Sequence, residues 1–369
     1  MKKITVELRN PYTCLIECGA LAHAGSLVRK YVPEDGMAVM VTTATVRRHW
    51  GNPVENSLRQ AGVRHQVLEM RDGERYKTMA TVEDLAERLV GLGSDRSTVM
   101  VALGGGVVGD VTGFAAAVYM RGLDVLQLPT TLMAMIDSAI GGKTGVNLKA
   151  GKNLVGVFHQ PRAVLIDPLA LNSLPEREYR SGLSEAIKYG IIRSRELYAM
   201  LERRRQEVRR RDPGCLETMI AECVRMKAEV VAADERESDL RRILNFGHTF
   251  GHALESATEY RRFLHGEAVA WGMIAACRLA ARLRRLSGEV ARAISENILA
   301  LTQPLPRIAV DAEKIWQNAG SDKKSRGGVL SFVLPREIGQ VEVVRGVPEA
   351  TVRETWQEII EFSHEHGTE

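Results

Sequence analysis

The sequence predicts an α/β domain built on a parallel sheet, followed by a mainly α-helical domain. The chain has 369 residues, which is long for a single hydrophobic core. Over the first 167 residues, short β-branched runs alternate with helical patterns, as is typical of a parallel sheet with helices on both faces. After Leu174-Pro175-Glu176 such runs become scarce. We therefore place one boundary near residue 175 and expect domains spanning residues 1–175 and 176–369.

The first domain is expected to contain strands and helices in alternation. Apolar residues recur at helical spacing over Thr45–Ala61 and Val82–Leu92, which predicts a helix in each place. Short β-branched or apolar runs predict the strands Ile4–Leu8, Met37–Thr42, His65–Leu68, Val99–Leu103, Val125–Leu128 and Val164–Ile166.

The second domain is predicted to be helical over most of its length. From Glu178 to about Leu301, nearly every segment has helical spacing and few β-branched clusters. Two later apolar runs, Val329–Leu334 and Gly339–Val344, are expected to form a hairpin. A last helix is expected from Pro348 to His364.

Composition and charge limit the possible partners. Apolar residues make up 45% of the chain and charged residues 26%, as in an ordinary globular protein. The 50 basic and 46 acidic residues give a formal net charge of +4. This small positive charge fits binding of an anionic small molecule and is too weak to indicate a nucleic-acid partner. No stretch approaches the ~20 apolar residues of a membrane span, and five scattered cysteines are typical of reduced thiols. We expect a cytoplasmic protein without membrane or nucleic-acid partners.

A glycine-rich turn indicates a nucleotide-binding site. The apolar run Val99–Leu103 leads into G-G-G-V-V-G-D, in which Gly104, Gly106 and Gly109 satisfy the pattern G-x-G-x-x-G. Such glycines let the backbone approach a pyrophosphate at the start of a helix. A plain tight turn explains the pattern equally well, and this turn lies far from the start of the chain. We therefore predict a variant, Rossmann-like domain, with Thr130-Thr131 at the same edge of the sheet.

Two other patterns do not support the motifs that they suggest. Gly141-Gly142-Lys143-Thr144 looks like the end of a phosphate loop, but the first glycine of that loop would have to replace Asp137. We interpret Lys143, Lys152 and Asn153 instead as separate donors to a small anionic ligand. Six arginines lie among residues 203–211, and we assign them to a solvated helix end without a function.

Three polar residues from separate segments suit a metal ion. Glu185, His248 and His265 offer one carboxylate and two imidazoles, which is the ligand number of a catalytic zinc site with one open position. His252 lies four residues after His248 and could also bind metal, although two hydrogen-bonded core histidines are an equal alternative. Lys188 lies three residues after Glu185, where a surface ion pair is the simpler interpretation.

Nine strings in this order resemble those of the 3-dehydroquinate synthase family over essentially the whole chain. They are G-G-G-V-V-G-D at 104–110, Y-M-R-G at 119–122, Q-L-P-T-T-L at 127–132, D-S-A-I-G-G-K-T-G-V-N at 137–147, G-K-N at 151–153, S-E-A-I-K-Y-G at 184–190, L-N-F-G-H-T-F-G-H-A-L-E at 244–255, H-G-E-A-V at 265–269 and D-K-K at 322–324. The resemblance implies the dehydroquinate synthase-like fold, with NAD and Zn²⁺ or Co²⁺ as cofactors.

The resemblance also implies roles for individual residues. It implies Glu185, His248 and His265 as metal ligands, with His252 in the substrate pocket. The implied cofactor-binding residues are Glu74, Lys77, Gly104, Gly105, Gly106, Val107, Gly109, Asp110, Thr130, Thr131, Asp137, Lys143 and Lys152. The implied catalytic and substrate-binding residues are Lys143, Lys152, Asn153, Lys188, Lys227, Arg241, Asn245, His252, Lys323 and Arg121. Arg121 would reach the site of a neighbouring subunit, so the resemblance implies a homodimer. Thr43 stands where the family often has an aspartate, which puts one ribose contact in question.

The implied activity is a phosphate-eliminating cyclisation, catalysed by a carbon–oxygen lyase of the shikimate pathway. The substrate would be 3-deoxy-D-arabino-heptulosonate 7-phosphate, a phosphorylated seven-carbon keto-sugar acid. Transient oxidation by NAD, loss of phosphate, re-reduction and an internal aldol addition would give 3-dehydroquinate. The alternatives are another sugar-phosphate cyclase and a metal-dependent polyol dehydrogenase on the same fold. A non-catalytic nucleotide-binding module would explain the glycine turn but not the three metal ligands.

Overall fold

The structure is a computed structural model that describes residues 1–236, 240–323 and 330–369, apart from the side chains of residues 319–323. The chain forms two compact units. The first comprises Met1–Pro175 and Pro213–Arg236, and the second comprises Glu176–Asp212 and Glu237–Glu369. The first unit therefore includes the segment Pro213–Arg236, which a single boundary near residue 175 does not predict.

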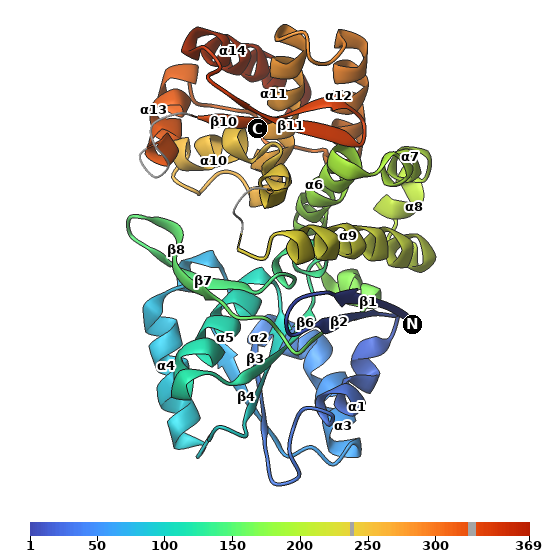
Figure 1. Cartoon of the computed structure of the whole chain (residues 1–369), viewed down its shortest axis with the longest axis vertical. Coiled ribbons are helices and arrows are strands. Elements are labelled where there is room, and N and C mark those ends of the chain that lie inside the picture. Colours follow the sequence, from blue (N-terminus) through green and yellow to red (C-terminus); the bar gives the residue numbers. More distant parts are fainter. Residues whose placement is uncertain (237–239, 324–329) are drawn as a thin grey trace. The chain divides into compact units, whose positions relative to one another are not determined.

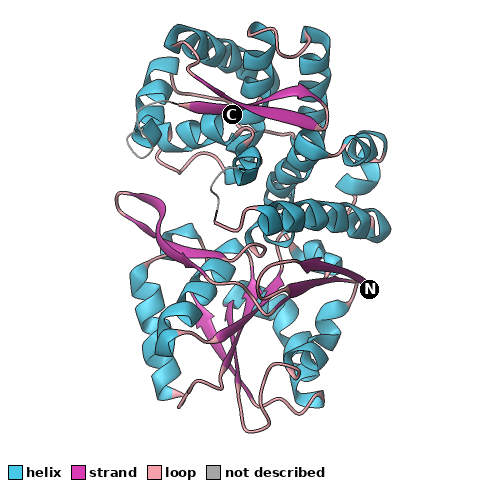
Figure 2. Cartoon of the chain, in the orientation of Figure 1, coloured by secondary structure: helices cyan, strands magenta, loops and turns pink. Residues whose placement is uncertain are grey.

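A seven-stranded sheet forms the centre of the first unit, with helices on both sides (Figure 2). Its strand order is β1-β2-β9-β6-β5-β3-β4, and all neighbouring pairs are parallel except β1 with β2. The strands are β1 Lys2–Val6, β2 Tyr12–Ile16, β3 Ala38–Thr43, β4 His65–Met70, β5 Val99–Gly104, β6 Asp124–Pro129 and β9 Ala163–Ile166. The predicted parallel sheet is confirmed, and β2 is an additional strand.

Most helices and short turns of the first unit lie in the connections between its strands, whereas α9 comes from a later part of the chain and packs against β1 (Figure 1). The helices are α1 Ala24–Val28, α2 Ala44–Val46, α3 Asn52–Gln60, α4 Met79–Gly91, α5 Gly106–Val118 and α9 Pro213–Ala233. The predicted helix over residues 45–61 is interrupted by a π-helical turn at Arg47–Gly51. Five further turns are η1 Ala20–His23, η3 Glu74–Tyr76, η4 Tyr119–Arg121, η5 Ala134–Ser138 and η6 Pro168–Ser173.

Alternation along the strands builds a core on each face of this sheet. Val39, Val41, Met100 and Ala102 belong to one cluster with the apolar faces of α4 and α5. The residues between them are also buried, as Met40 shows at 0% exposure. Strands buried on both faces read as continuous apolar runs, which explains why the sequence predicts them well.

A second, smaller sheet in the first unit was not predicted. Strands β7 (Lys143–Leu148) and β8 (Gly151–Phe158) form an antiparallel hairpin beside α5. The hairpin is tight, because a Cβ on Gly156 would lie 2.0 Å from the carbonyl oxygen of Thr144. Lys143, Lys152 and Asn153 all belong to this hairpin.

The second unit is mainly helical, as predicted. Its helices are α6 Glu176–Arg193, α7 Arg195–Arg203, α8 Arg205–Arg209, α10 His248–Ala257, α11 His265–Arg282, α12 Gly288–Thr302, α13 Ala312–Lys323 and α14 Glu349–His366, with the turn η7 at Leu240–Asn245. The predicted hairpin is confirmed as β10 Ser331–Glu337 and β11 Gln340–Arg345, while Val329 lies outside the described residues.

Helix α11 is the buried centre of this unit, and glycines let two neighbouring helices approach it closely. It packs against α6, α10, α12 and α14. A Cβ on Gly272 would lie 2.1 Å from the carbonyl oxygen of Gly247, which precedes α10 with a left-handed φ of 78°. At the other end, the N–H of Gly266 donates to Ser181 Oγ on α6 at 3.0 Å. These contacts bring the first residues of α10 and α11 beside the middle of α6.

Candidate functional site

The three predicted metal ligands lie together in the second unit. The Oε1 atom of Glu185 lies 3.5 Å from Nε2 of His248 and 3.7 Å from Nε2 of His265. Zinc bonds of about 2.0–2.2 Å in a tetrahedron separate neighbouring donor atoms by about 3.3–3.5 Å. The donor atoms therefore have nearly the spacing that one ion requires. They come from α6, α10 and α11 respectively.

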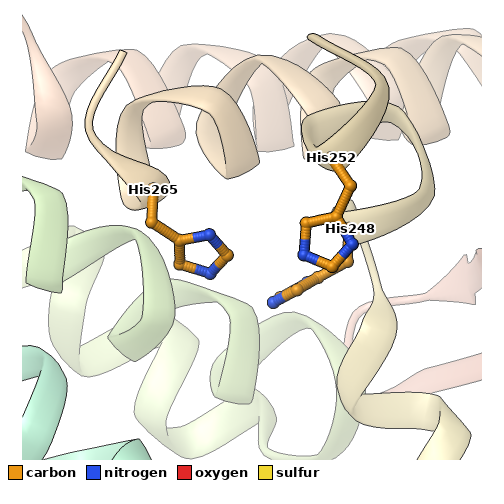
Figure 3. A group of neighbouring side chains, drawn as sticks. All are labelled: His248, His252 and His265. Carbon is orange, nitrogen blue, oxygen red and sulfur yellow. The ribbon is translucent and has the colours of Figure 1, made fainter. Parts of the chain in front are cut away.

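His252 is a further donor at the same place. The possible ligand nitrogens of His248, His252 and His265 lie within 4.8 Å of one another. Figure 3 shows their rings converging, with His248 and His252 carried by α10 and His265 by the start of α11. His252 is exposed, whereas His248 is buried. The geometry thus allows His252 either to contact a substrate or to bind the metal.

Hydrogen bonds orient two of these imidazoles. Nδ1 of His248 lies 3.0 Å from the carbonyl oxygen of Phe246, and Nδ1 of His265 lies 3.2 Å from Oε2 of Glu255. A carbonyl or carboxylate oxygen can only accept, so in the neutral ring each Nδ1 carries the proton and each Nε2 keeps its lone pair. Glu255 was not singled out from the sequence, although its spacing of seven from His248 places it on the same face of α10.

The carboxylate of Glu185 is buried in a way that favours a cation. The side chain has 0% exposure, and its Oε1 accepts no hydrogen bond from any described residue. Its Oε2 forms an ion pair with Lys188, which is itself 1% exposed, and its Oε1 faces the imidazoles of His248 and His265. A buried carboxylate oxygen without a hydrogen bond is costly, and a metal bound at Oε1 would remove that cost.

Electrostatics keep His248 ready to bind a metal. Burial, and secondarily the charge of Lys188, lower the pKa of His248 well below its usual range. The imidazole is therefore neutral near pH 7, which is the form that coordinates metal ions. The residues present fit a divalent cation with nitrogen and oxygen ligands.

The predicted nucleotide turn has the geometry of an anion-binding loop in the first unit. It joins β5 to the start of α5, which has no side-chain cap at Gly105. A Cβ on Gly105 would lie 2.8 Å from Cγ2 of Thr131, so the turn has no room for a side chain there. The N–H of Thr130 donates to the carbonyl oxygen of Gly104 at 2.9 Å and joins the two predicted segments. Free N–H groups at a helix start suit a pyrophosphate.

A polar network connects the other predicted cofactor residues. Nζ of the buried Lys77 lies 2.5 Å from Oδ2 of Asp110 and 2.5 Å from Oδ1 of Asn153. Asn147 joins the network by donating from Nδ2 to Glu74 at 2.8 Å and accepting from the N–H of Asn153 at 2.9 Å. Burial raises the pKa of Asp110, and the charge of Lys77 opposes that rise. Asn147 was not predicted, although it closes a string that resembles the family.

A second ion pair in the first unit joins two more predicted residues. Lys227 on α9 pairs with Asp137 in η5, and its side chain is 7% exposed. Helix α9 also packs against β1 and η5, which explains why this segment belongs to the first unit. The sequence places Lys227 in the helical half of the chain and does not show that it contacts Asp137.

The remaining predicted residues are spread over both units. In the first unit, Lys143 is exposed on β7, Lys152 is partly exposed on β8, and Arg121 is exposed in η4 with a φ of 68°. In the second unit, Arg241 is 1% exposed and Asn245 partly exposed, both in η7. The side chain of Lys323 lies outside the described residues. Their roles stay predictions.

Profiles of two domains match consecutive parts of this chain. The profile of the 3-dehydroquinate synthase N-terminal domain matches residues 67–181, and that of the C-terminal domain matches residues 182–325. The chain belongs to the 3-dehydroquinate synthase family. The 3-dehydroquinate synthase of Koribacter versatilis (strain Ellin345) is 53% identical over 348 residues, covering 94% of this chain and 95% of the relative. That of Solibacter usitatus (strain Ellin6076) is 51% identical, covering 93% and 95%.

Solved structures of related cyclases have the same fold as this member of the 3-dehydroquinate synthase family. A 2-deoxy-scyllo-inosose synthase complexed with carbaglucose-6-phosphate, NAD⁺ and Co²⁺ has a TM-score of 0.86 at 29% identity, covering 98% of this chain and 99% of that one. The 2-epi-5-epi-valiolone synthase of Streptomyces hygroscopicus subsp. jinggangensis 5008, with NAD⁺ and Zn²⁺ bound, has a TM-score of 0.88 at 29% identity, covering 96% and 98%.

More distant structures share the fold alone. The glycerol dehydrogenase of Schizosaccharomyces pombe has a TM-score of 0.68 at 16% identity, covering 95% of this chain and 89% of that one. Within the described residues, the helices are too short or too polar to cross a membrane.

Proposed function

We propose that this protein is a 3-dehydroquinate synthase, which converts 3-deoxy-D-arabino-heptulosonate 7-phosphate to 3-dehydroquinate and phosphate. The observation that carries the proposal is the 53% identity to a 3-dehydroquinate synthase over 94% of this chain. The clustered donors Glu185, His248 and His265 support it, because this chemistry needs a Lewis acid beside a redox cofactor. We propose NAD and Zn²⁺ or Co²⁺, which occur together in the related cyclases.

The metal would be held by Glu185, His248 and His265, with His252 available to the substrate. When bound, the metal supplies a Lewis acid for the substrate's hydroxyl and ketone oxygens, and NAD supplies an oxidant that takes a hydride and returns it. Lys188 holds the Glu185 carboxylate from its Oε2 side and leaves Oε1 toward the imidazoles. This ion pair favours the orientation of Glu185 in which Oε1 would bind the metal.

Cationic and polar side chains would bind the two anionic groups of the substrate. We assign Arg241 and Lys227 to the carboxylate, and Lys143, Lys152, Asn153, His252, Lys323 and Arg121 to the phosphate. The phosphate can accept the proton that must leave before elimination, so the protein's main task is to position the substrate. We also propose that Arg121 acts in a neighbouring subunit of a homodimer.

The nucleotide would be bound at the glycine turn and the Lys77 network. The start of α5 presents N–H groups to the pyrophosphate, while Glu74 and Lys77 would contact the adenosine half. The ion pair between Asp137 and Lys227 would link the nicotinamide side of the cofactor site to a substrate-binding cation. None of the five cysteines forms a disulfide, which suits the reducing cytoplasm, where we place the enzyme.

The decisive test is phosphate release from the seven-carbon substrate, with and without a metal chelator. We expect one phosphate per substrate, inhibition by the chelator, and no net NADH. Release of phosphate only from other sugar phosphates would favour the alternative of a different cyclase, which the cyclase structures at 29% identity keep open. Net NADH formation from an alcohol would favour a polyol dehydrogenase instead.

A further inference from the structure

We propose that Glu255 is a positioning residue for the metal, holding the His265 ring so that Nε2 faces Glu185. The inference rests on the proposed function only in requiring a divalent cation at this cluster. The carboxylate oxygen Oε2 of Glu255 lies 3.2 Å from Nδ1 of His265. Glu255 does not contact the substrate or the ion in this proposal and acts through His265 alone.

The position of Glu255 follows from the periodicity of α10. His248, His252 and Glu255 stand at positions i, i+4 and i+7, so one face of the helix carries two imidazoles and a carboxylate. Helix α11 begins at His265 and packs against α10. The carboxylate thereby meets the first residue of α11, where no preceding helical turn holds the ring in place.

The carboxylate sets the protonation of the ring. Glu255 is 2% exposed, so water competes little for its oxygens. A buried carboxylate accepts from Nδ1–H and so leaves the lone pair of His265 on Nε2, 3.7 Å from Oε1 of Glu185. It also compensates the positive charge that an imidazole gains when it binds a cation.

His248 provides an internal comparison. Its Nδ1 donates to the backbone carbonyl of Phe246, which no side-chain substitution can remove. The Nδ1 of His265 instead donates to the side chain of Glu255, and the His265 side chain is 35% exposed. Loss of Glu255 should therefore free one ligand ring and leave the other in place. This predicts weakened metal binding and not its complete loss.

The first experiment measures Zn²⁺ affinity of the full-length protein by competition with a chromophoric chelator. Glu255→Leu should lower the affinity about 10- to 100-fold. Glu255→Gln keeps an acceptor oxygen, so the loss should be no more than about threefold.

The matched control is Glu358→Gln, which also removes one carboxylate charge paired with α11, but at Arg278 and Arg282. It should keep wild-type affinity. Wild-type affinity in a folded Glu255→Leu protein, or an equal loss in the control, would overturn the proposal.

The second experiment determines which ring nitrogen of His265 carries the proton. It needs neither activity nor the leucine variant. Nitrogen-15 NMR of histidine-labelled, metal-free wild-type protein should show His265 protonated at Nδ1. Protonation at Nε2 in the wild type would refute the proposal even if Glu255→Leu fails to fold. Both measurements omit substrate and NAD, so an inactive protein with the expected affinities and tautomer would contradict the proposed function and leave the role of Glu255 intact.

Discussion

The contact between Gly272 and Gly247 provides a sharp test of how the metal ligands are held together. In Gly272→Ala, the new Cβ would lie 2.1 Å from the carbonyl oxygen of Gly247, whereas carbon–oxygen contacts of this kind lie at about 3.3 Å. The helices must therefore move apart by about 1.2 Å, the difference between these two distances. Gly247 directly precedes His248, so the displacement reaches the ligands.

The expected magnitudes follow from that displacement. Overpacking of this size costs about 1–3 kcal/mol, which is a fall of several degrees in Tm. Ligand positions must hold to within about 0.5 Å for a productive site, so a shift of about 1.2 Å should lower metal affinity at least about tenfold. Urea denaturation of the metal-free protein measures the first effect, and competition with a chromophoric chelator measures the second.

The matched control is Gly288→Ala at the start of α12, where an added Cβ would meet no described atom within 4 Å. It should change stability by less than about 1 kcal/mol and leave metal affinity unchanged. A folded Gly272→Ala protein with wild-type metal affinity would refute the reasoning, because it would show that α10 and α11 can separate without moving the ligands.

Three further variants and one treatment test other parts of the site. Glu185→Gln should lower bound metal at least about tenfold by elemental analysis, since it removes the anionic ligand, and full metal content would contradict its assignment. Lys227→Met should raise KM or lower kcat at least about tenfold while leaving the Kd for NAD⁺ unchanged, and wild-type kinetics would remove Lys227 from the substrate site. Thr43→Asp keeps an oxygen that can accept from the N–H of Val46 and adds an acceptor for a ribose hydroxyl, so calorimetry should show tighter NAD⁺ binding. An unchanged Kd for NAD⁺ would mean that residue 43 lies away from the ribose. Metal removal should stop phosphate release but not NAD⁺ binding, with activity restored by Zn²⁺ or Co²⁺; activity that survives complete removal would contradict a metal-dependent reaction.

The sequence predicted those parts of the fold in which burial shapes the amino-acid pattern. Strands β3 and β5 are buried along their whole length, and their apolar runs were found nearly to the residue. The hairpin β7–β8 was missed because its glycines, lysines and asparagines resemble a ligand-binding loop. Exposed residues make up most of β8, so no apolar alternation marks it as a strand. Helix α9 was predicted as helical, but periodicity does not show which unit a helix packs against.

The site was predicted in its residue types but not in its contacts. Glu185 and Lys188 have the spacing of an ordinary surface pair, and only the packing of α6 shows that both are buried. Glu255 and Asn147 contact residues in other elements, His265 and Glu74 respectively, and spacing within one element does not reveal such contacts. The resemblance to a family gave the ligand set, and the structure adds the hydrogen bonds that orient two of its members.

The charges around Glu185 help to explain why an anionic substrate suits this site. The carboxylate and Lys188 compensate each other, and the lowered pKa of His248 keeps that ring neutral. The Glu255 carboxylate beside His265 offsets part of the charge of a divalent cation, and the positive charge that remains favours an anion bound next to it. A sugar acid phosphate supplies the missing negative charge, whereas a neutral polyol does not, so the electrostatics favour the cyclase over a dehydrogenase on the same fold.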